Sequence, residues 1–290
     1  MSMPAPRLID LPTGRVAFRR AGEGPPLLLI HGWGGSSRHW LGAFFTLTSN
    51  YDVIAIDLPG FGYSSTPRAP ARLRTLTAAT LELIDALELD EFAVGGHSLG
   101  AAVAMLVAAA RPDAATRVIL SSFGLPRSPG EAELMGWLHV SLLTSSALWA
   151  PWLDLWEPWQ IAMRPITQVA WTVPPLPVVL AGHVVHNPPE IPYAALAVGV
   201  ADLIAMSARA GLEAASTTGD PTVIAASQAL SVPTLVIGGR EDRLFPPDAA
   251  RALVRTLPRA GLVLFDRCAH VPMVEVPGPF YSTVGAFLMA

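Results

Sequence analysis

The chain has 290 residues, of which 51% are hydrophobic and 14% are charged, so it is long enough to bury a large core in one α/β domain with an insertion. Its formal net charge is −4 and its basic residues do not cluster, which excludes the electrostatic footprint of a nucleic-acid-binding protein. The single cysteine, Cys268, excludes internal disulfides and cysteine-based metal clusters.

The first part of the chain alternates strand-like and helix-like segments. The predicted strands cover 8–11, 15–20, 26–30, 51–57, 91–95 and 117–121; the first two are joined as a hairpin, and 26–30 is a continuous apolar run. The predicted helices have apolar residues at helical spacing and cover 38–47, 76–87 and 101–110. Such alternation is typical of a doubly wound, mostly parallel sheet, which is the fold class we expect.

The alternation stops after Gly124. From Leu125 to about Ala229 the sequence has no clear strand, many prolines and six of the eight tryptophans. It resumes with a strand over 232–239, a helix over 248–257, a strand over 262–265 and a last helix near the C-terminus. We therefore predict an α/β core over 1–124 and 229–290, and a helical cap or lid over 125–228.

The pentapeptide Gly96-His97-Ser98-Leu99-Gly100 lies between a predicted strand and a predicted helix. A serine with glycines two residues away on either side, in that context, fits a nucleophile elbow, a tight and strained strand-to-helix turn. Side chains at Gly96 and Gly100 would collide with that turn. The start of the helix then brings free N–H groups close to the serine oxygen. We expect Ser98 to be a catalytic nucleophile.

A serine hydroxyl needs a base to accept its proton, and the base needs a third group to orient it. His270 follows the last predicted strand and so lies at the carboxyl edge of the sheet, the same edge as Ser98, which makes it the expected base. Glu241 and Asp242 leave another strand at that edge, and either could orient the histidine. The chain order serine, acid, histidine is the order of the α/β-hydrolases.

Four motifs in this order make the chain resemble the α/β-hydrolase fold superfamily over essentially its whole core. They are His31-Gly32-Trp33-Gly34-Gly35, the segment from Asp57 to Ser64, the Ser98 pentapeptide, and the acid and histidine loops. Within that superfamily the chain looks most like small esterases and lipases with a helical cap. The family pattern Gly-x-x-Asp-x-x-x-Pro fits Gly239, Asp242 and Pro246, so the resemblance selects Asp242 as the acid.

The resemblance also implies an oxyanion hole, the pair of donors that binds the developing negative charge. One backbone N–H would belong to Leu99 and the other to Trp33. The family gives Asp57 a structural role, and we expect Cys268 to pack in the interior.

The predicted cap supplies the candidate substrate pocket. Trp149, Trp152, Trp156 and Trp159 recur at helical spacing, and Pro151 and Pro158 predict two short helices rather than one long one. We expect two of these rings to pack the cap onto the core and the others to form an aromatic roof over Ser98 that accepts an apolar group. The candidate pocket residues are Trp137, Trp149, Trp152, Trp156 and Trp159.

Leu134 to Leu153 contains no Asp, Glu, Lys or Arg. His139, a central group of Ser and Thr residues and Pro151 argue against a membrane-spanning helix, and favour a lid or interfacial helix. Peripheral contact of the cap with a membrane is therefore an alternative to its role as a roof.

These observations predict a serine hydrolase that cleaves carboxylic esters with apolar groups through an acyl-enzyme, with a small apolar ester-like substrate as partner. A C–C bond hydrolase or thioesterase with the same triad, or a non-hydrolytic cyclase, lyase or binding protein of a biosynthetic pathway, remain alternatives. No metal-ligand spacing or phosphate loop is evident, so no metal and no cofactor are expected. The N-terminus lacks the pattern of a signal peptide, which predicts a cytoplasmic location. The sequence does not indicate an oligomeric state.

Overall fold

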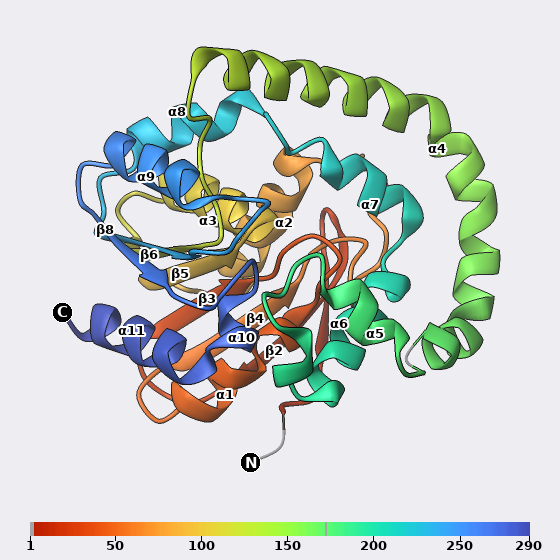
Figure 1. Cartoon of the computed structure of the whole chain (residues 1–290), viewed down its shortest axis with the longest axis horizontal. Helices are drawn as coiled ribbons and strands as arrows, with labels where there is room; N and C mark the ends of the chain where they lie inside the picture. The colour runs from red at the N-terminus through yellow and green to blue at the C-terminus, as the bar shows by residue number, and fades with distance from the viewer. Residues whose placement is uncertain (1–2, 172) are drawn as a thin grey trace.

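Strands in the computed structural model, which describes residues 3–171 and 173–290, form one eight-stranded sheet in the order β1-β2-β4-β3-β5-β6-β7-β8 (Figure 1). The strands are β1 (Arg7–Leu11), β2 (Gly14–Ala21), β3 (Pro26–Ile30), β4 (Asp52–Asp57), β5 (Phe92–His97), β6 (Ala115–Ser121), β7 (Thr234–Gly239) and β8 (Ala260–Phe265). The pairs β1–β2 and β2–β4 are antiparallel and the others are parallel. This confirms the predicted mostly parallel, doubly wound sheet.

Helices cover both faces of the sheet and fill the insertion between β6 and β7. They are α1 (Leu41–Thr46), α2 (Leu73–Ala86), α3 (Leu99–Ala110), α4 (Pro129–Trp171), α5 (Leu176–Ala181), α6 (Tyr193–Ala205), α7 (Ala208–Ala215), α8 (Pro221–Ala229), α9 (Pro247–Thr256), α10 (Pro272–Glu275) and α11 (Pro277–Met289). The described residues also contain two short 3₁₀ helices, η1 (Ser37–Trp40) and η2 (Pro188–Glu190).

The apolar run of β3 is buried on both faces of the sheet. Leu28 and Ile30 belong to the core under α2, α3, α8 and α9, whereas Leu27 and Leu29 belong to the core under α1 and α11. Successive side chains of a strand point to opposite faces, so a strand covered by helices on both sides must be apolar throughout. This two-sided burial holds the carboxyl ends of the central strands at one fixed edge.

The insertion between β6 and β7 contains α4 to α8. Helices α6 and α7 pack against α4, while α8 packs against α3 and α9. Val223 and Ala226 of α8 share a core cluster with the central strands. The predicted boundaries at residues 124 and 228 stay predictions. Helix α8 belongs to the predicted cap range except for its last residue, Ala229, and it packs on the core helices α3 and α9.

Helix α4 corrects one expectation, since it is a single helix of 43 residues that runs through Pro151, Pro158 and Pro165. The three prolines are seven residues apart, which is close to two helical turns, so they lie on the same side, and all three are exposed. Each proline removes one helical hydrogen bond and bends the helix away from its ring. The bends therefore add up instead of breaking the helix, and Figure 1 shows α4 as an arc that is convex away from the rest of the molecule.

Within residues 3–171 and 173–290, no helix taken singly is both long and apolar enough to cross a membrane. The pair α6 and α7, bent by 95° at the break between them, meets the length and composition test together.

Candidate active site

Ser98 lies in the turn between β5 and α3. Its φ of 52° and ψ of −117° fall outside the regions that L-residues favour, as a nucleophile elbow requires. Glycine is needed on both sides, because a Cβ on Gly96 would lie 2.0 Å from the Gly100 carbonyl oxygen, and one on Gly100 would lie 2.3 Å from that of Ile30. The Ser98 N–H donates to the Ser121 carbonyl at 2.9 Å, which ties the turn to β6.

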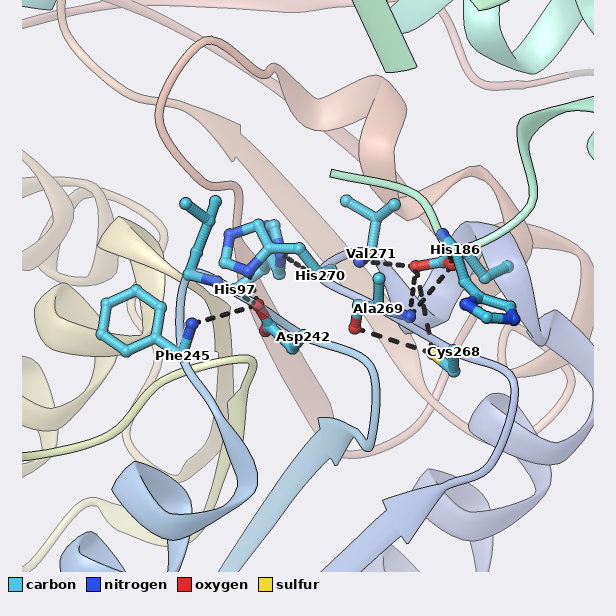
Figure 2. Close-up of polar contacts among 10 residues, drawn as sticks. His97, His186, Asp242, Phe245, Cys268, Ala269, His270 and Val271 are labelled. Carbon is cyan, nitrogen blue, oxygen red and sulfur yellow. Dashed lines mark hydrogen bonds and ion pairs between the residues drawn. The ribbon is translucent and has the colours of Figure 1, made fainter. Parts of the chain in front are cut away.

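Asp242 and His270 meet at the same edge of the sheet, in the loops after β7 and β8. His270 Nδ1 lies 2.9 Å from Asp242 Oδ2, while Asp242 Oδ1 accepts hydrogen bonds from the backbone N–H groups of Leu244 and Phe245 at 2.9 and 3.0 Å (Figure 2). A carboxylate only accepts, so Nδ1 carries a proton, and in the neutral ring held this way Nε2 presents the lone pair. The ring of Phe245 stacks on His270, with centroids 6.0 Å apart and planes 15° apart. The imidazole is thus held in the form that can accept a proton at Nε2.

Glu241, the other carboxylate that the sequence left open, has a different partner. Its Oε2 accepts a hydrogen bond from the Cys268 N–H at 2.9 Å, so it fixes the loop before His270 and does not contact the imidazole. Cys268 itself is fully buried, and burial together with the nearby Glu275 carboxylate raises the pKa of its thiol.

Trp33 and Leu99 both offer unused backbone donors. In the part of the chain that the structure describes, the N–H groups of these two residues donate to no protein acceptor. Leu99 is the first residue of α3, so its N–H is one of the donors that a helix start always leaves free. The Trp33 indole N–H donates to the Gly211 carbonyl in α7 at 2.7 Å, which attaches this loop to the insertion. Ser98, the Asp242–His270 pair and these two free N–H groups all lie in the segments that follow β3, β5, β7 and β8, at the carboxyl edge of the sheet.

The predicted aromatic pocket is not what the structure contains. Its members are all between 58% and 67% exposed: Trp137, Trp149, Trp152, Trp156 and Trp159. The expectation that two of them pack the cap onto the core is therefore wrong, and rings this exposed do not form a roof that excludes water. The helical spacing of the tryptophans is confirmed, since they all lie in α4. Their side of the helix faces solvent, because α4 contacts the rest of the protein through its other side.

Two buried carboxylates outside the predicted site have structural roles. Asp57 is fully buried, and its two oxygens accept from the N–H groups of Ser37 at 2.6 Å and Tyr63 at 2.9 Å, as the resemblance implies. Asp202 in α6 accepts from Ser36 Oγ at 2.7 Å and pairs with Arg38. Burial raises the pKa of Asp202, and the Arg38 charge opposes that shift.

Glu275 is a residue that the sequence reasoning missed. One of its oxygens accepts from the N–H groups of Ala269 and Val271 at 3.1 and 3.0 Å, on either side of His270, and the other accepts from the His186 N–H at 2.7 Å (Figure 2). The His270 N–H in turn donates to the Val184 carbonyl at 3.0 Å. One carboxylate and one carbonyl therefore join the His270 loop to the segment after α5. No sequence pattern separates Glu275 from an ordinary surface acid.

Three further histidines lie in a buried row beside His270. The ring centroids are 4.9 Å apart for His97 and His270, 6.1 Å for His39 and His97, and 6.4 Å for His31 and His39. Burial lowers the pKa of all three, that of His39 from 6.5 to about 3, with the charges of neighbouring histidines adding to the effect for His39 and His97. His97 Nε2 donates to the His270 carbonyl at 2.7 Å, so the row also supports the backbone of the proposed base.

This row predicts that the fold loses stability in acid. In the unfolded chain His39 takes up a proton near pH 6.5, whereas in the fold it stays neutral down to about pH 3. Between these values the unfolded chain binds more protons, so the free energy of unfolding falls as the pH falls, by up to about 1.4 kcal/mol per pH unit for each such group. We expect the Tm of the wild type to fall more steeply than that of His39→Gln between pH 6.5 and 4.5. Equal slopes would contradict a neutral His39.

In residues 3–171 and 173–290, no group of three or more His, Cys, Asp or Glu side chains is arranged to hold a metal ion.

Comparison with known proteins places this chain in a family. Residues 27–283 match the sequence profile of the alpha/beta hydrolase family. The chain is 30% identical over 278 residues to the pimeloyl-[acyl-carrier protein] methyl ester esterase of Nitrosomonas europaea, covering 93% of this chain and 98% of that one. It is 28% identical over 280 residues to the 2-hydroxymuconate semialdehyde hydrolase of Pseudomonas sp. strain CF600, covering 94% and 90%. An esterase structure from Exiguobacterium antarcticum shares the fold, with a TM-score of 0.75 at 17% identity over 99% and 100% of the two chains.

Proposed function

The chain belongs to the alpha/beta hydrolase family, and from this premise we propose that it is a serine hydrolase that cleaves carboxylic esters with apolar groups. The observation that supports this most directly is the 2.9 Å contact between His270 Nδ1 and Asp242 Oδ2, at the sheet edge that also holds the Ser98 turn. A bare Nε2 is what a serine nucleophile needs from its base.

In the proposed first half-reaction, Ser98 Oγ attacks the ester carbonyl carbon while its proton moves to His270 Nε2. The carbonyl oxygen becomes an oxyanion and accepts hydrogen bonds from the Trp33 and Leu99 N–H groups, each of which lowers the barrier by about 3 kcal/mol. Collapse of this intermediate breaks the bond to the alcohol, which leaves with the proton from Nε2. Asp242 stabilises the imidazolium while it exists.

In the second half-reaction, water attacks the acyl-enzyme. Its proton moves to His270 Nε2, the same two N–H groups bind the oxyanion, and Ser98 leaves as the alcohol after it regains a proton. The products are a carboxylic acid and the free enzyme, so the sequence of steps consumes one water for each ester.

The proposal favours esters over C–C bonds. A C–C bond hydrolase needs a cation that binds the carboxylate of its substrate. Arg38, in the turn after the Trp33 loop, does not offer a free cation, because it is already paired with Asp202 at 3.0 Å. Val271 also follows His270, where the C–C hydrolases often have a tryptophan. The relative from Nitrosomonas europaea is named as a methyl ester esterase, which agrees with this preference.

The test is hydrolysis of p-nitrophenyl esters with acyl chains from two to sixteen carbons, together with labelling by a fluorophosphonate. We expect turnover with a maximum at one range of acyl lengths, and labelling of a single peptide that contains Ser98. A folded protein that neither hydrolyses any of these esters nor reacts with the fluorophosphonate would contradict the proposal. Labelling without ester turnover would instead favour a thioester or diketone substrate.

Glu275→Ala is expected to lower kcat/KM by about 10- to 100-fold. The change leaves the part-buried N–H groups of Ala269 and Val271 without this acceptor, which costs about 1–3 kcal/mol for each and loosens the His270 loop, and it also removes the exposed contact to the His186 N–H. Glu275→Gln keeps one acceptor oxygen and should lose less. The measurement is the pH profile of kcat/KM, in which a positioning role shifts the acidic limb. Equal loss in both variants, with an unchanged profile, would indicate a purely structural role.

A further inference from the structure

Helix α4 differs from an ordinary surface helix, because its large aromatic side chains lie on the side that faces solvent. The side that faces the protein is held by polar contacts. Gln160 Nε2 donates to the Met206 carbonyl at 2.6 Å, Gln160 Oε1 accepts from the Ala208 N–H at 3.1 Å, and Asp154 pairs with Arg209 at 2.9 Å. Glu157 accepts from the Thr66 hydroxyl. A helix that only covered a core would turn its apolar side inward and its polar side to solvent.

The outer side of α4 is apolar and aromatic. Its most prominent members, all more than half exposed, are Leu148, Trp149, Trp152, Leu155, Trp156 and Trp159, which we call the outer face. From Leu134 to Met163 the helix contains only two charged residues, Asp154 and Glu157, and both have the partners described above. The apolar surface of the outer face is larger than the patches that soluble monomers usually expose. We therefore expect a binding partner to cover it in the functional state.

The tryptophans indicate what that cover is. Each indole has a large apolar body and one N–H that must stay hydrogen-bonded when it is buried. A dry protein interface would have to supply a separate acceptor for each of the four rings of the outer face. The boundary between lipid headgroups and acyl chains supplies water, ester and phosphate oxygens everywhere, which is why tryptophan concentrates there. The chemistry of the outer face therefore fits a lipid surface better than a second protein.

The shape of the helix agrees with this occupant. Figure 1 shows α4 as an arc, convex away from the rest of the molecule, and the four tryptophans lie around the middle of its 43 residues. Two rigid copies of such an arc would meet over only a short stretch, whereas a fluid bilayer can follow its curvature. Since no single helix in the described part of the chain can cross a membrane, the helix would lie in the interface.

We propose that the outer face of α4 docks the protein onto the surface of a lipid bilayer, with the helix axis parallel to the membrane. The outer face has no unpaired charge, so binding is driven by burial of apolar area and not by attraction to anionic lipids. Binding to phosphatidylcholine should therefore be at least as strong as binding to phosphatidylglycerol, which repels the net negative charge of the chain, and salt should not weaken it.

The test is co-sedimentation of the full chain with phosphatidylcholine vesicles in 50 and 500 mM NaCl. We expect binding at both salt concentrations, and at least a tenfold loss of partitioning for the double variant Trp152→Gln/Trp156→Gln, since glutamine keeps helix propensity. The control is Leu8→Gln/Met289→Gln, which removes exposed apolar side chains outside α4 and should bind like the wild type. Lipids brominated near the headgroup should quench tryptophan fluorescence more than lipids brominated near the chain ends.

Three results would overturn the proposal. One is the absence of sedimentation with any vesicle, and another is equal binding by the wild type and the Trp152→Gln/Trp156→Gln variant when circular dichroism reports the same helix content. The third is a wild-type dimer, measured by light scattering, that the same variant converts to a monomer without affecting vesicle binding. In that case a second copy of the chain covers the outer face. None of these measurements depends on catalysis.

Discussion

Ser98→Ala is expected to lower kcat for ester hydrolysis by about 10⁵- to 10⁶-fold, the loss that follows removal of the nucleophile in a serine hydrolase. Without Oγ no acyl-enzyme forms, and the remaining rate comes from the anion site and substrate binding. The backbone of the turn should persist, because the Ser98 N–H still donates to Ser121 and the glycines at 96 and 100 are unchanged. The measurement is the single-turnover rate with the best p-nitrophenyl ester.

Ser121→Ala is the matched control. Ser121 is fully buried at the end of the neighbouring strand, its backbone carbonyl accepts from the Ser98 N–H, and its hydroxyl has no hydrogen-bond partner among the described residues. This variant should keep kcat within about threefold, because the backbone contact survives the loss of the hydroxyl. If Ser98→Ala retained more than about one percent of the wild-type rate, another residue would have to be the nucleophile.

Asp242→Asn is expected to lower kcat by about 10⁴-fold. The amide can still accept from the N–H groups of Leu244 and Phe245 through its oxygen, which turns its NH₂ group toward His270 Nδ1. Nδ1 must then accept, so the ring proton moves to Nε2, and the base no longer has a lone pair for the Ser98 proton. The loss should appear in kcat rather than in KM, because the changed tautomer affects proton transfer and not substrate binding.

Glu241→Gln tests whether the effect belongs to Asp242 or to negative charge in that loop. Its side-chain oxygen can still accept from the Cys268 N–H, so the loop geometry is preserved while one charge is removed. We expect less than a tenfold change. A loss as large as that of Asp242→Asn would show that the charge of the loop matters more than the imidazole tautomer.

The fold could be predicted because its signals are local. The unbroken apolar run of 26–30 and the apolar centre of 51–57, Val53 to Ile56, have one physical explanation, burial on both faces of a sheet, and the structure contains β3 and β4 there. The positions of Ser98, Asp242 and His270 were predictable for a related reason, since each follows a recognisable strand and parallel strands bring their carboxyl ends to one edge. Their catalytic roles remain predictions.

The parts that could not be predicted depend on partners distant in sequence. The periodicity of Trp149 to Trp159 identifies one side of a helix but does not say whether the protein or the solvent meets it. From the sequence alone, prolines within a helical pattern are interpreted as ends of helices. In α4 the three prolines lie on one side, and for this reason they bend the helix without breaking it. Glu275 acts through hydrogen bonds to backbone groups, and these have no signature in the side-chain sequence.

The contacts that join His270 to Val184, and Glu275 to His186, have a consequence for how this enzyme can be rebuilt. Exchanging the insertion between β6 and β7 for that of a relative would be one way to seek a new specificity. Here the segment around 184–186 and the loop over 266–276 must be exchanged together, because each supplies hydrogen-bond partners for backbone groups of the other. A chimera that takes its insertion from a relative should lose turnover unless the matching histidine loop is transplanted with it.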